Sequence, residues 1–99
     1  MGPASFHRLA DQALSDTALY YELESAGLGI AFLGEVERCL RSSSKQPEAA
    51  PLLSGSIRRR ILRRLPYALL YTTKPDGIRI LAGMNLKRRP AYSVGRKQQ

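Results

Sequence analysis

A Lys-Pro-Asp-Gly turn at residues 74–77 separates two stretches rich in β-branched and large apolar residues, 67–73 and 78–84. Proline presets its backbone φ angle, aspartate hydrogen-bonds to its own backbone, and glycine tolerates positive φ. The turn therefore predicts an antiparallel hairpin of two strands. Apolar side chains occupy successive positions in both strands, which is typical of strands covered on both faces.

The segment just before this hairpin, residues 56–65, interleaves five arginines with large aliphatic side chains. As a strand it carries arginine on both faces, because successive side chains point to opposite sides. A solvated amphipathic helix is the alternative, since aliphatic residues recur at i, i+4 and i+8. Pro66, which closes the segment, and the strand-like run that follows it favour the strand.

Charge is distributed unevenly along the 99 residues, whose formal net charge is +8. Residues 1–50 hold four Lys/Arg and seven Asp/Glu, a net of −3, whereas residues 51–99 hold twelve Lys/Arg and one aspartate, a net of +11. Such a chain attracts polyanions, either nucleic acid or an acidic protein segment. The alternative is that the arginines only keep a sheet face soluble.

Helical periodicity dominates the acidic half. A first apolar stripe comprises Ala10, Leu14, Thr17/Ala18 and Tyr21. Residues 26–29, Ala-Gly-Leu-Gly, interrupt the pattern because glycine favours a cap conformation and costs about 1 kcal/mol inside a helix. A second helix is expected to bury Phe32, Leu33, Val36, Cys39 and Leu40 and to expose Glu35, Glu37, Arg38 and Arg41. The two helices should form a hairpin.

These patterns predict one α+β domain spanning residues 1–99, in which the hairpin packs on a small, mostly antiparallel sheet. We expect the helix hairpin at about 9–43, a loop rich in serine and proline at 44–55, a β-meander at about 56–86 and a basic tail at 87–99. A short first strand at residues 4–7 is compatible with Phe6.

Several classes of site are not expected. No apolar run approaches the roughly 18–20 residues of a membrane span, and the N-terminus lacks a signal-like pattern, so we expect a cytoplasmic protein. One cysteine, Cys39, and one histidine, His7, cannot supply a disulfide or a structural zinc site. We expect no metal, no cofactor and no small-molecule substrate, and Cys39 should be a small core residue.

An ordered series of short motifs resembles the RelE/ParE toxins of type II toxin–antitoxin systems over residues 6–96. The series is Phe6-His7, Ala10, Tyr20-Tyr21-Glu22, Gly27-Leu28-Gly29, Phe32-Leu33, Val36-Glu37, Arg60 to Leu65, Pro66-Tyr67, Leu70-Tyr71, Gly77-Ile78, Ile80-Leu81-Ala82 and Lys87-Arg88-Arg89-Pro90-Ala91-Tyr92. The resemblance implies a helix hairpin on a sheet and a cognate antitoxin that wraps the toxin. It also implies one of two targets, mRNA in the ribosome or DNA gyrase.

Three positions depart from the ribonuclease members of that family. Ala68 stands where those members usually carry arginine, Asn85 where many carry histidine, and Arg89 where an acidic residue is common. An amide cannot exchange protons near neutral pH, so the general acid–base roles of RNA cleavage lack their usual groups. We therefore favour a non-enzymatic, ParE-like gyrase inhibitor of the kind that stabilises plasmids. A ribosome-dependent mRNA endoribonuclease is the alternative, and a basic nucleic-acid-binding module is a second one.

Candidate site residues follow from charge and from the resemblance. Binding of the target or of nucleic acid is assigned to Arg58, Arg60, Arg64, Lys87, Arg88, Arg89 and Arg96. If the protein is a ribonuclease, the weak catalytic candidates are Arg60, Arg64, Arg88 and Tyr92. Antitoxin binding is assigned to Leu19, Leu23, Phe32, Val36 and Arg58, because an amphipathic helix with acidic side chains would match apolar hairpin grooves beside a basic strand.

Overall fold

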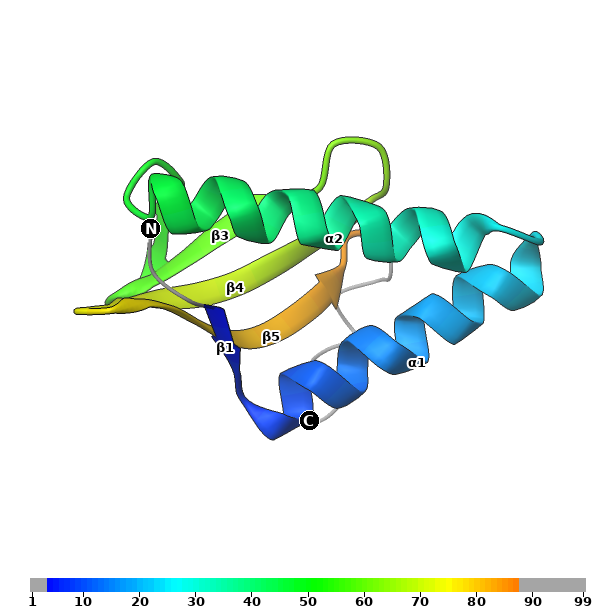
Figure 1. Ribbon diagram of the computed structural model, residues 1–99, viewed down its shortest axis with the longest axis horizontal. Coiled ribbons are helices and arrows are strands. Elements are labelled where there is room, and N and C mark those ends of the chain that lie inside the picture. Colours follow the sequence, from blue (N-terminus) through cyan, green and yellow to red (C-terminus); the bar gives the residue numbers. More distant parts are fainter. Residues whose placement is uncertain (1–3, 88–99) are drawn as a thin grey trace.

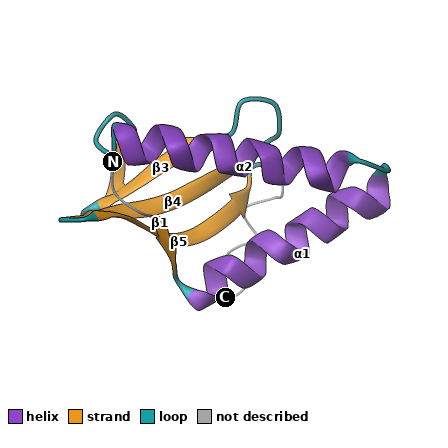
Figure 2. Cartoon of the chain, in the orientation of Figure 1, coloured by secondary structure: helices purple, strands orange, loops and turns teal. Residues whose placement is uncertain are grey.

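Two helices pack side by side on one face of a five-stranded sheet in the computed structural model, which describes residues 4–87 (Figure 1). The elements in chain order are β1 (Ala4–Phe6), α1 (Arg8–Glu24), α2 (Leu28–Lys45), β2 (Leu52–Ser54), β3 (Ile57–Ile61), β4 (Tyr67–Lys74) and β5 (Gly77–Asn85). Figure 2 shows the helices as one layer and the strands as the other. The predicted α+β fold class is confirmed.

The strands lie in the order β1-β5-β4-β3-β2. β1 runs parallel to β5, and every other neighbouring pair is antiparallel. Pro75 and Asp76 form the two-residue connection between β4 and β5, whose first pair is Lys74 with Gly77. The hairpin predicted from the Pro-Asp-Gly turn is therefore present, and it forms the centre of the sheet together with β3.

The arginine-rich segment forms a strand, as favoured over the helix, but the strand ends at Ile61 rather than near residue 65. The chain then turns sharply, because the backbone N–H of Leu62 donates to the carbonyl of Tyr67 at 2.9 Å. Leu62 is buried by this turn, whereas Arg63 and Arg64 are exposed. The segment therefore places two of its five arginines on a loop.

The turn between the helices is held by one carboxylate. Gly27 adopts φ +88°, a conformation that side chains other than glycine's rarely accept, and its N–H donates to Glu22 Oε2 at 2.8 Å. Gly29 N–H donates to Glu22 Oε1 at 2.9 Å. These two hydrogen bonds hold the pKa of Glu22 below its usual value. The break in helical pattern is shorter than expected, since Gly29 already belongs to α2.

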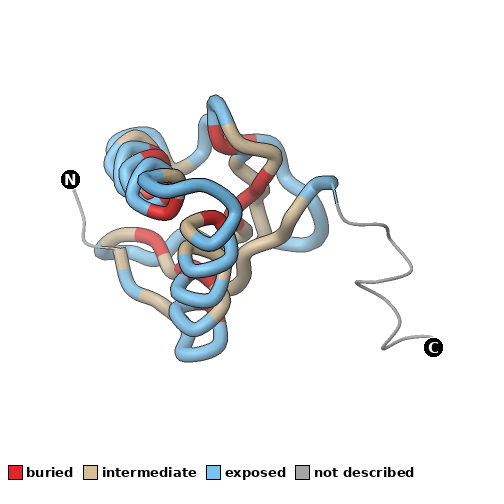
Figure 3. The backbone as a smooth tube through the Cα atoms, turned by 90° about the vertical axis from the view of Figure 1, so that its right-hand side faces the viewer, coloured by how far each residue is buried: buried red, intermediate tan, exposed pale blue. Residues whose placement is uncertain are grey.

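The core between the two layers is built from buried residues of both helices and of the strands, and Figure 3 marks the buried residues along the backbone. Tyr21 and Phe32, one from each helix, have ring centroids 5.3 Å apart, and Phe32 meets Tyr67 of β4 edge to face at 5.0 Å. Cys39 is buried in the same cluster, as predicted. A second cluster contains Ala10, Ala50, Tyr71, Ile78 and Ile80.

Three local expectations were wrong. The stretch expected to be a loop at 44–55 contains β2, which pairs with β3 although its three residues are exposed, and α2 extends to Lys45. Glu35 was expected to face solvent, yet it is only 6% exposed. Leu33 was expected in the core and is 47% exposed, because α2 turns its Phe32, Val36 and Cys39 side chains toward the sheet instead.

Neither described helix is both long and apolar enough to cross a membrane.

Gly29 and Gly34 provide a test of how tightly the two helices approach. A Cβ atom on Gly29 would lie 2.5 Å from the carbonyl oxygen of Ala18 on α1, whereas one on Gly34 would meet nothing within 4 Å. We expect Gly29→Ala to destabilise the fold by about 1–3 kcal/mol, because the helices must separate. Gly34→Ala should be neutral or stabilising by up to about 1 kcal/mol, because alanine is the better helix former. Urea unfolding of both variants measures this, and equal effects would contradict the close approach.

Candidate functional site

Strand β3 presents its arginines on both faces of the sheet, as the alternation of the sequence predicts. Residues directly opposite each other on neighbouring strands point to the same side. Arg58 pairs with Tyr71 and Arg60 with Leu69, both of which pack against the helices. Arg59 therefore lies on the opposite face of the sheet.

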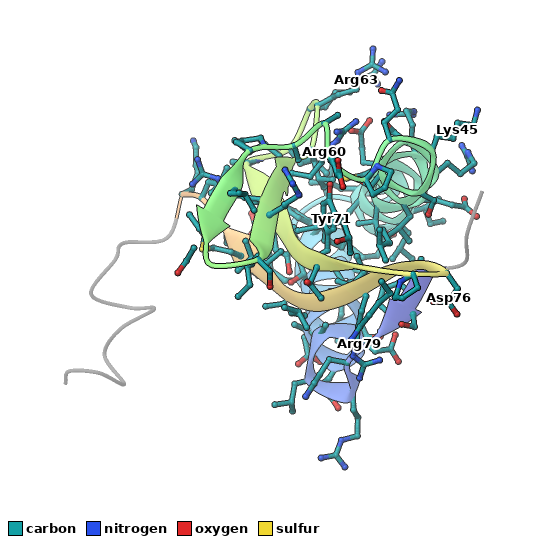
Figure 4. All side chains as sticks on the ribbon, turned by 90° about the vertical axis from the view of Figure 1, so that its left-hand side faces the viewer. Lys45, Arg60, Arg63, Tyr71, Asp76 and Arg79 are labelled. Atoms are coloured by element: carbon teal, nitrogen blue, oxygen red, sulfur yellow. The ribbon has the colours of Figure 1, made fainter. Side chains whose placement is uncertain are left out.

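Arg58 and Arg60 are fixed by contacts within the protein. Arg58 Nη1 donates to the carbonyl of Ala50 at 2.7 Å and to that of Glu48 at 3.2 Å, so it holds the chain between α2 and β2. Arg60 Nη2 donates to Ser42 Oγ on α2. Figure 4 shows Arg60 between the strands and α2, on the side where Tyr71 also lies. Both residues are partly buried, and each uses an N–H group of its guanidinium for a hydrogen bond within the protein.

Glu35 connects α2 to the loop after β3. Its Oε2 atom accepts from Arg38 Nη1 at 2.6 Å, and its Oε1 atom accepts from the backbone N–H of Arg63 at 3.2 Å. The Arg38 guanidinium lowers the pKa of the Glu35 carboxyl, and the N–H of Arg63 adds to this effect against the cost of burial. A buried carboxylate thus fixes the backbone from which Arg63 and Arg64 project.

The face of the sheet away from the helices is mainly apolar at its centre. Leu70 pairs with Arg59 on one side and with Ala82 on the other, and Ala68 pairs with Ile61 and Met84. Arg79, on the same face, donates through Nη1 to Ser5 Oγ at 3.5 Å.

Three side chains that could transfer protons, those of His7, Cys39 and Tyr67, have structural roles. His7 is the N-cap of α1, and its Nδ1 atom accepts from the N–H of Leu9 at 3.1 Å. Burial raises the pKa of the Cys39 thiol and of the Tyr67 phenol, which makes both weaker acids. No group of three or more potential metal-binding side chains occurs in this part of the chain.

The candidate antitoxin contacts divide into exposed and buried residues. Leu19 and Leu23 lie one turn apart on α1 and are 59% and 79% exposed. Phe32 and Val36 were wrongly placed on an outer groove, because both are buried in the core beneath α2. The surface of the isolated chain therefore offers Leu19 and Leu23, but not Phe32 or Val36.

The candidate target-binding residues are only partly covered by the structure. Arg64 and Lys87 are exposed. Arg88, Arg89, Tyr92 and Arg96 lie outside the described residues, so the proposed basic tail is represented only by Lys87.

A cationic pocket on α2 was missed by the sequence analysis. Arg38, Arg41 and Lys45 line it at i, i+3 and i+7, a spacing that places them on one side of a helix. That spacing is the signal that could have found the pocket, but the contrast between the two halves of the chain drew attention to the later arginines.

Solved structures decide which fold this is. A chain of the chromosomal ParDE TA system from P. aeruginosa matches with a TM-score of 0.76 and 16% sequence identity, covering 88% of this chain and 98% of its own. The isolated E. coli RelE toxin matches with a TM-score of 0.66 and 17% identity, covering 99% of this chain and 98% of its own. The chain has the RelE/ParE toxin fold.

No family model and no curated protein matches the sequence. The RelE/ParE fold is thus visible in the arrangement of the elements, although only about one residue in six is shared with either structure.

The structure shows where two of the positions that differ from the ribonuclease members lie, Ala68 and Asn85. Ala68 is fully buried at the centre of the sheet, on the face away from the helices. Asn85 ends β5, and its Oδ1 atom accepts from the N–H of Lys87 at 2.8 Å. Position 68 therefore carries a buried methyl group, and position 85 carries an amide that is already hydrogen-bonded to the backbone.

Glu35→Gln tests the role of the buried carboxylate. A folded-state pKa lowered by Arg38 contributes stability above the ordinary value of 4.5, and this stability is lost as pH falls through the lowered pKa. We expect the variant to be less stable than the parent at neutral pH, and the gap to narrow below about pH 4.5 as Glu35 becomes protonated. Urea midpoints measured across pH report the gap.

The matched control is Glu37→Gln on the same helix, because Glu37 is exposed. Its effect should stay within about 0.5 kcal/mol, as for most surface changes. A stability gap for Glu35→Gln that is independent of pH would contradict the assigned role of its charge.

Proposed function

We propose that the chain is the toxin of a type II toxin–antitoxin module, that it acts by binding rather than by catalysis, and that its target is DNA gyrase. The observation that carries the toxin role is the fold shared with the ParDE chain and with the RelE toxin over nearly the whole of each. Both structural matches support a toxin role, which the two systems share. The choice of target is argued from this chain's own residues.

Binding without catalysis is supported by the groups that the fold occupies. RNA cleavage needs a base, an acid and cations for the phosphorane charge, and each proton-transfer role typically contributes about 10²- to 10⁴-fold. His7 caps a helix, Ala68 brings no cation to the sheet, and Asn85 brings no titratable group. Arg60 is held by Ser42 and so is poorly placed to follow a reacting phosphate.

A purified preparation distinguishes gyrase from the ribosome. We expect the protein to convert supercoiled plasmid into cleaved products only when gyrase is present, and to leave mRNA intact in a translating extract. Tyr92→Phe should keep full toxicity, because it changes the best remaining catalytic candidate without changing shape. Ribosome-dependent truncation of mRNA that is lost in Tyr92→Phe would overturn the proposal in favour of the endoribonuclease.

We also propose that the antitoxin lays an apolar helix face over Leu19 and Leu23. Two exposed leucines at i and i+4 form a short apolar strip on α1, the kind of surface that an amphipathic helix covers. The basic second half of the chain favours an antitoxin segment with acidic side chains next to that face. Arg58 contributes less than its charge suggests, because it already holds the carbonyls of Ala50 and Glu48.

The double variant Leu19→Ala/Leu23→Ala should bind the product of the neighbouring open reading frame about 10- to 100-fold more weakly, because each leucine loses up to about 1.5 kcal/mol of burial. Leu9→Ala is the matched control, since Leu9 lies on the same helix and is 64% exposed. Isothermal titration gives both affinities. Equal weakening by the control, or none by the double variant, would place the antitoxin elsewhere.

A further inference from the structure

The outward side of α2 near its C-terminal end carries a pocket whose charged residues are all cationic. The pocket has a volume of about 420 Å³ and is lined by Arg38, Arg41, Ser42, Lys45 and Gln46. All five side chains can donate hydrogen bonds, and none is a carboxylate. Figure 4 shows Lys45 projecting from α2 into solvent, with Arg63 projecting from the neighbouring loop.

Within the described residues, the protein pairs only one of these three cations with a carboxylate. In residues 4–87, the only ion pair joins Arg38 to Glu35, so Arg41 and Lys45 have no carboxylate partner there. Glu35 is buried, and the hydrogen bond from the Arg63 backbone to it brings a further exposed arginine beside the α2 cations. Positive charge thus gathers on one surface formed by α2 and the loop after β3, which we call the α2 cationic surface: Arg38, Arg41, Lys45 and Arg63.

The spacing of the α2 cations suits a row of regularly spaced anions. With a rise of 1.5 Å per residue, Arg38 and Arg41 are separated by about 4.5 Å along the helix axis, and Arg41 and Lys45 by about 6 Å. A nucleic-acid strand in a duplex carries one phosphate per roughly 3.4 Å of its axis. Long, flexible arginine and lysine side chains at these intervals can each reach a different phosphate oxygen.

The chemistry of the lining favours a duplex over other polyanions. Single-stranded nucleic acid is bound through aromatic side chains that stack on bases, and no aromatic residue lines this pocket. An acidic peptide would be expected to bury apolar side chains too, and the lining offers none. The negative end of the α2 dipole opposes anions, so the formal charges must supply the attraction.

We propose that the α2 cationic surface binds the phosphate backbone of a nucleic-acid duplex without reading its sequence. Arg41 and Lys45 contact phosphates directly, Arg38 donates its remaining N–H groups, and Ser42 and Gln46 can add neutral hydrogen bonds of the kind that fix a duplex in register. This binding surface is separate from the leucines assigned to the antitoxin, and it does not depend on the choice between gyrase and ribosome.

The test uses the full chain and a fluorescent DNA duplex of about 20 base pairs, with affinity measured by anisotropy from about 50 to 200 mM salt. We expect Arg41→Gln/Lys45→Gln to weaken binding by roughly 10-fold or more at about 100 mM salt. It should also reduce the slope of log affinity against log salt by about 1.8, because each lost phosphate contact contributes about 0.9.

The matched control is Arg8→Gln/Lys74→Gln, which removes the same charge from two exposed positions outside the α2 cationic surface. It should weaken binding by less than about 3-fold, because only the long-range field changes. Circular dichroism and urea unfolding confirm that both double variants fold.

Three results would overturn the proposal. They are equal weakening by the two double variants, absence of duplex binding by the parent protein at about 100 mM salt, and competition by oligoglutamate as effective as by unlabelled duplex at equal charge. A parallel titration with an RNA duplex of the same sequence shows which kind of duplex the surface prefers. Preference for either duplex, with the same sensitivity to Arg41→Gln/Lys45→Gln, supports the proposal and shows whether DNA or RNA is the ligand.

Discussion

The pairing of β3 with β4 decides where every arginine of the basic strand points. Because Arg58 lies opposite Tyr71 and Arg60 opposite Leu69, these two arginines share the face that the helices cover. There they must find acceptors, and they do so on the carbonyls of Glu48 and Ala50 and on the hydroxyl of Ser42. A shift of one residue would exchange the two faces and bring Arg59 under the helices instead. The register thus gives neighbouring arginines of one strand different surroundings: Arg58 and Arg60 bind groups under the helices, and Arg59 lies on the other face.

Helix α2 brings together packing, loop geometry and charge. Its inner side places Phe32 and Val36 in the core. Its buried Glu35 accepts a hydrogen bond from the backbone N–H of Arg63 in the loop after β3. Its outer side carries cations along the last turns. The carboxylate costs little here because an arginine and a backbone N–H satisfy it, whereas an unpaired buried charge would be strongly destabilising. The exposed arginines of the neighbouring loop are consequently held by a helix whose own charge has the same sign.

The fold engages some ionisable side chains in its own contacts and leaves others exposed to solvent. His7 is used for capping, Cys39 and Tyr67 for packing, and the amide of Asn85 accepts a hydrogen bond. Exposed cations lie on α2 and on the loop after β3, and others, such as Arg8 and Lys74, lie elsewhere on the surface. Binding by electrostatic complementarity requires no perturbed acid or base, only cations fixed in place by the fold.

The sequence by itself determined the class of fold and the central hairpin, because Pro75, Asp76 and Gly77 act through local backbone preferences. It also determined the helical stripes that bury Ala10, Leu14 and Tyr21, since their periodicity is a property of α1 alone. The tertiary structure decided the end of β3, the pairing of β2 and the burial of Glu35. These features depend on partners distant in the chain: a carbonyl of β4, an edge of β3 and an N–H of Arg63. Local patterns cannot specify such contacts: the helical spacing brings Arg38, Arg41 and Lys45 to one side of α2, but Arg63 is added only by the hydrogen bond from its backbone to Glu35.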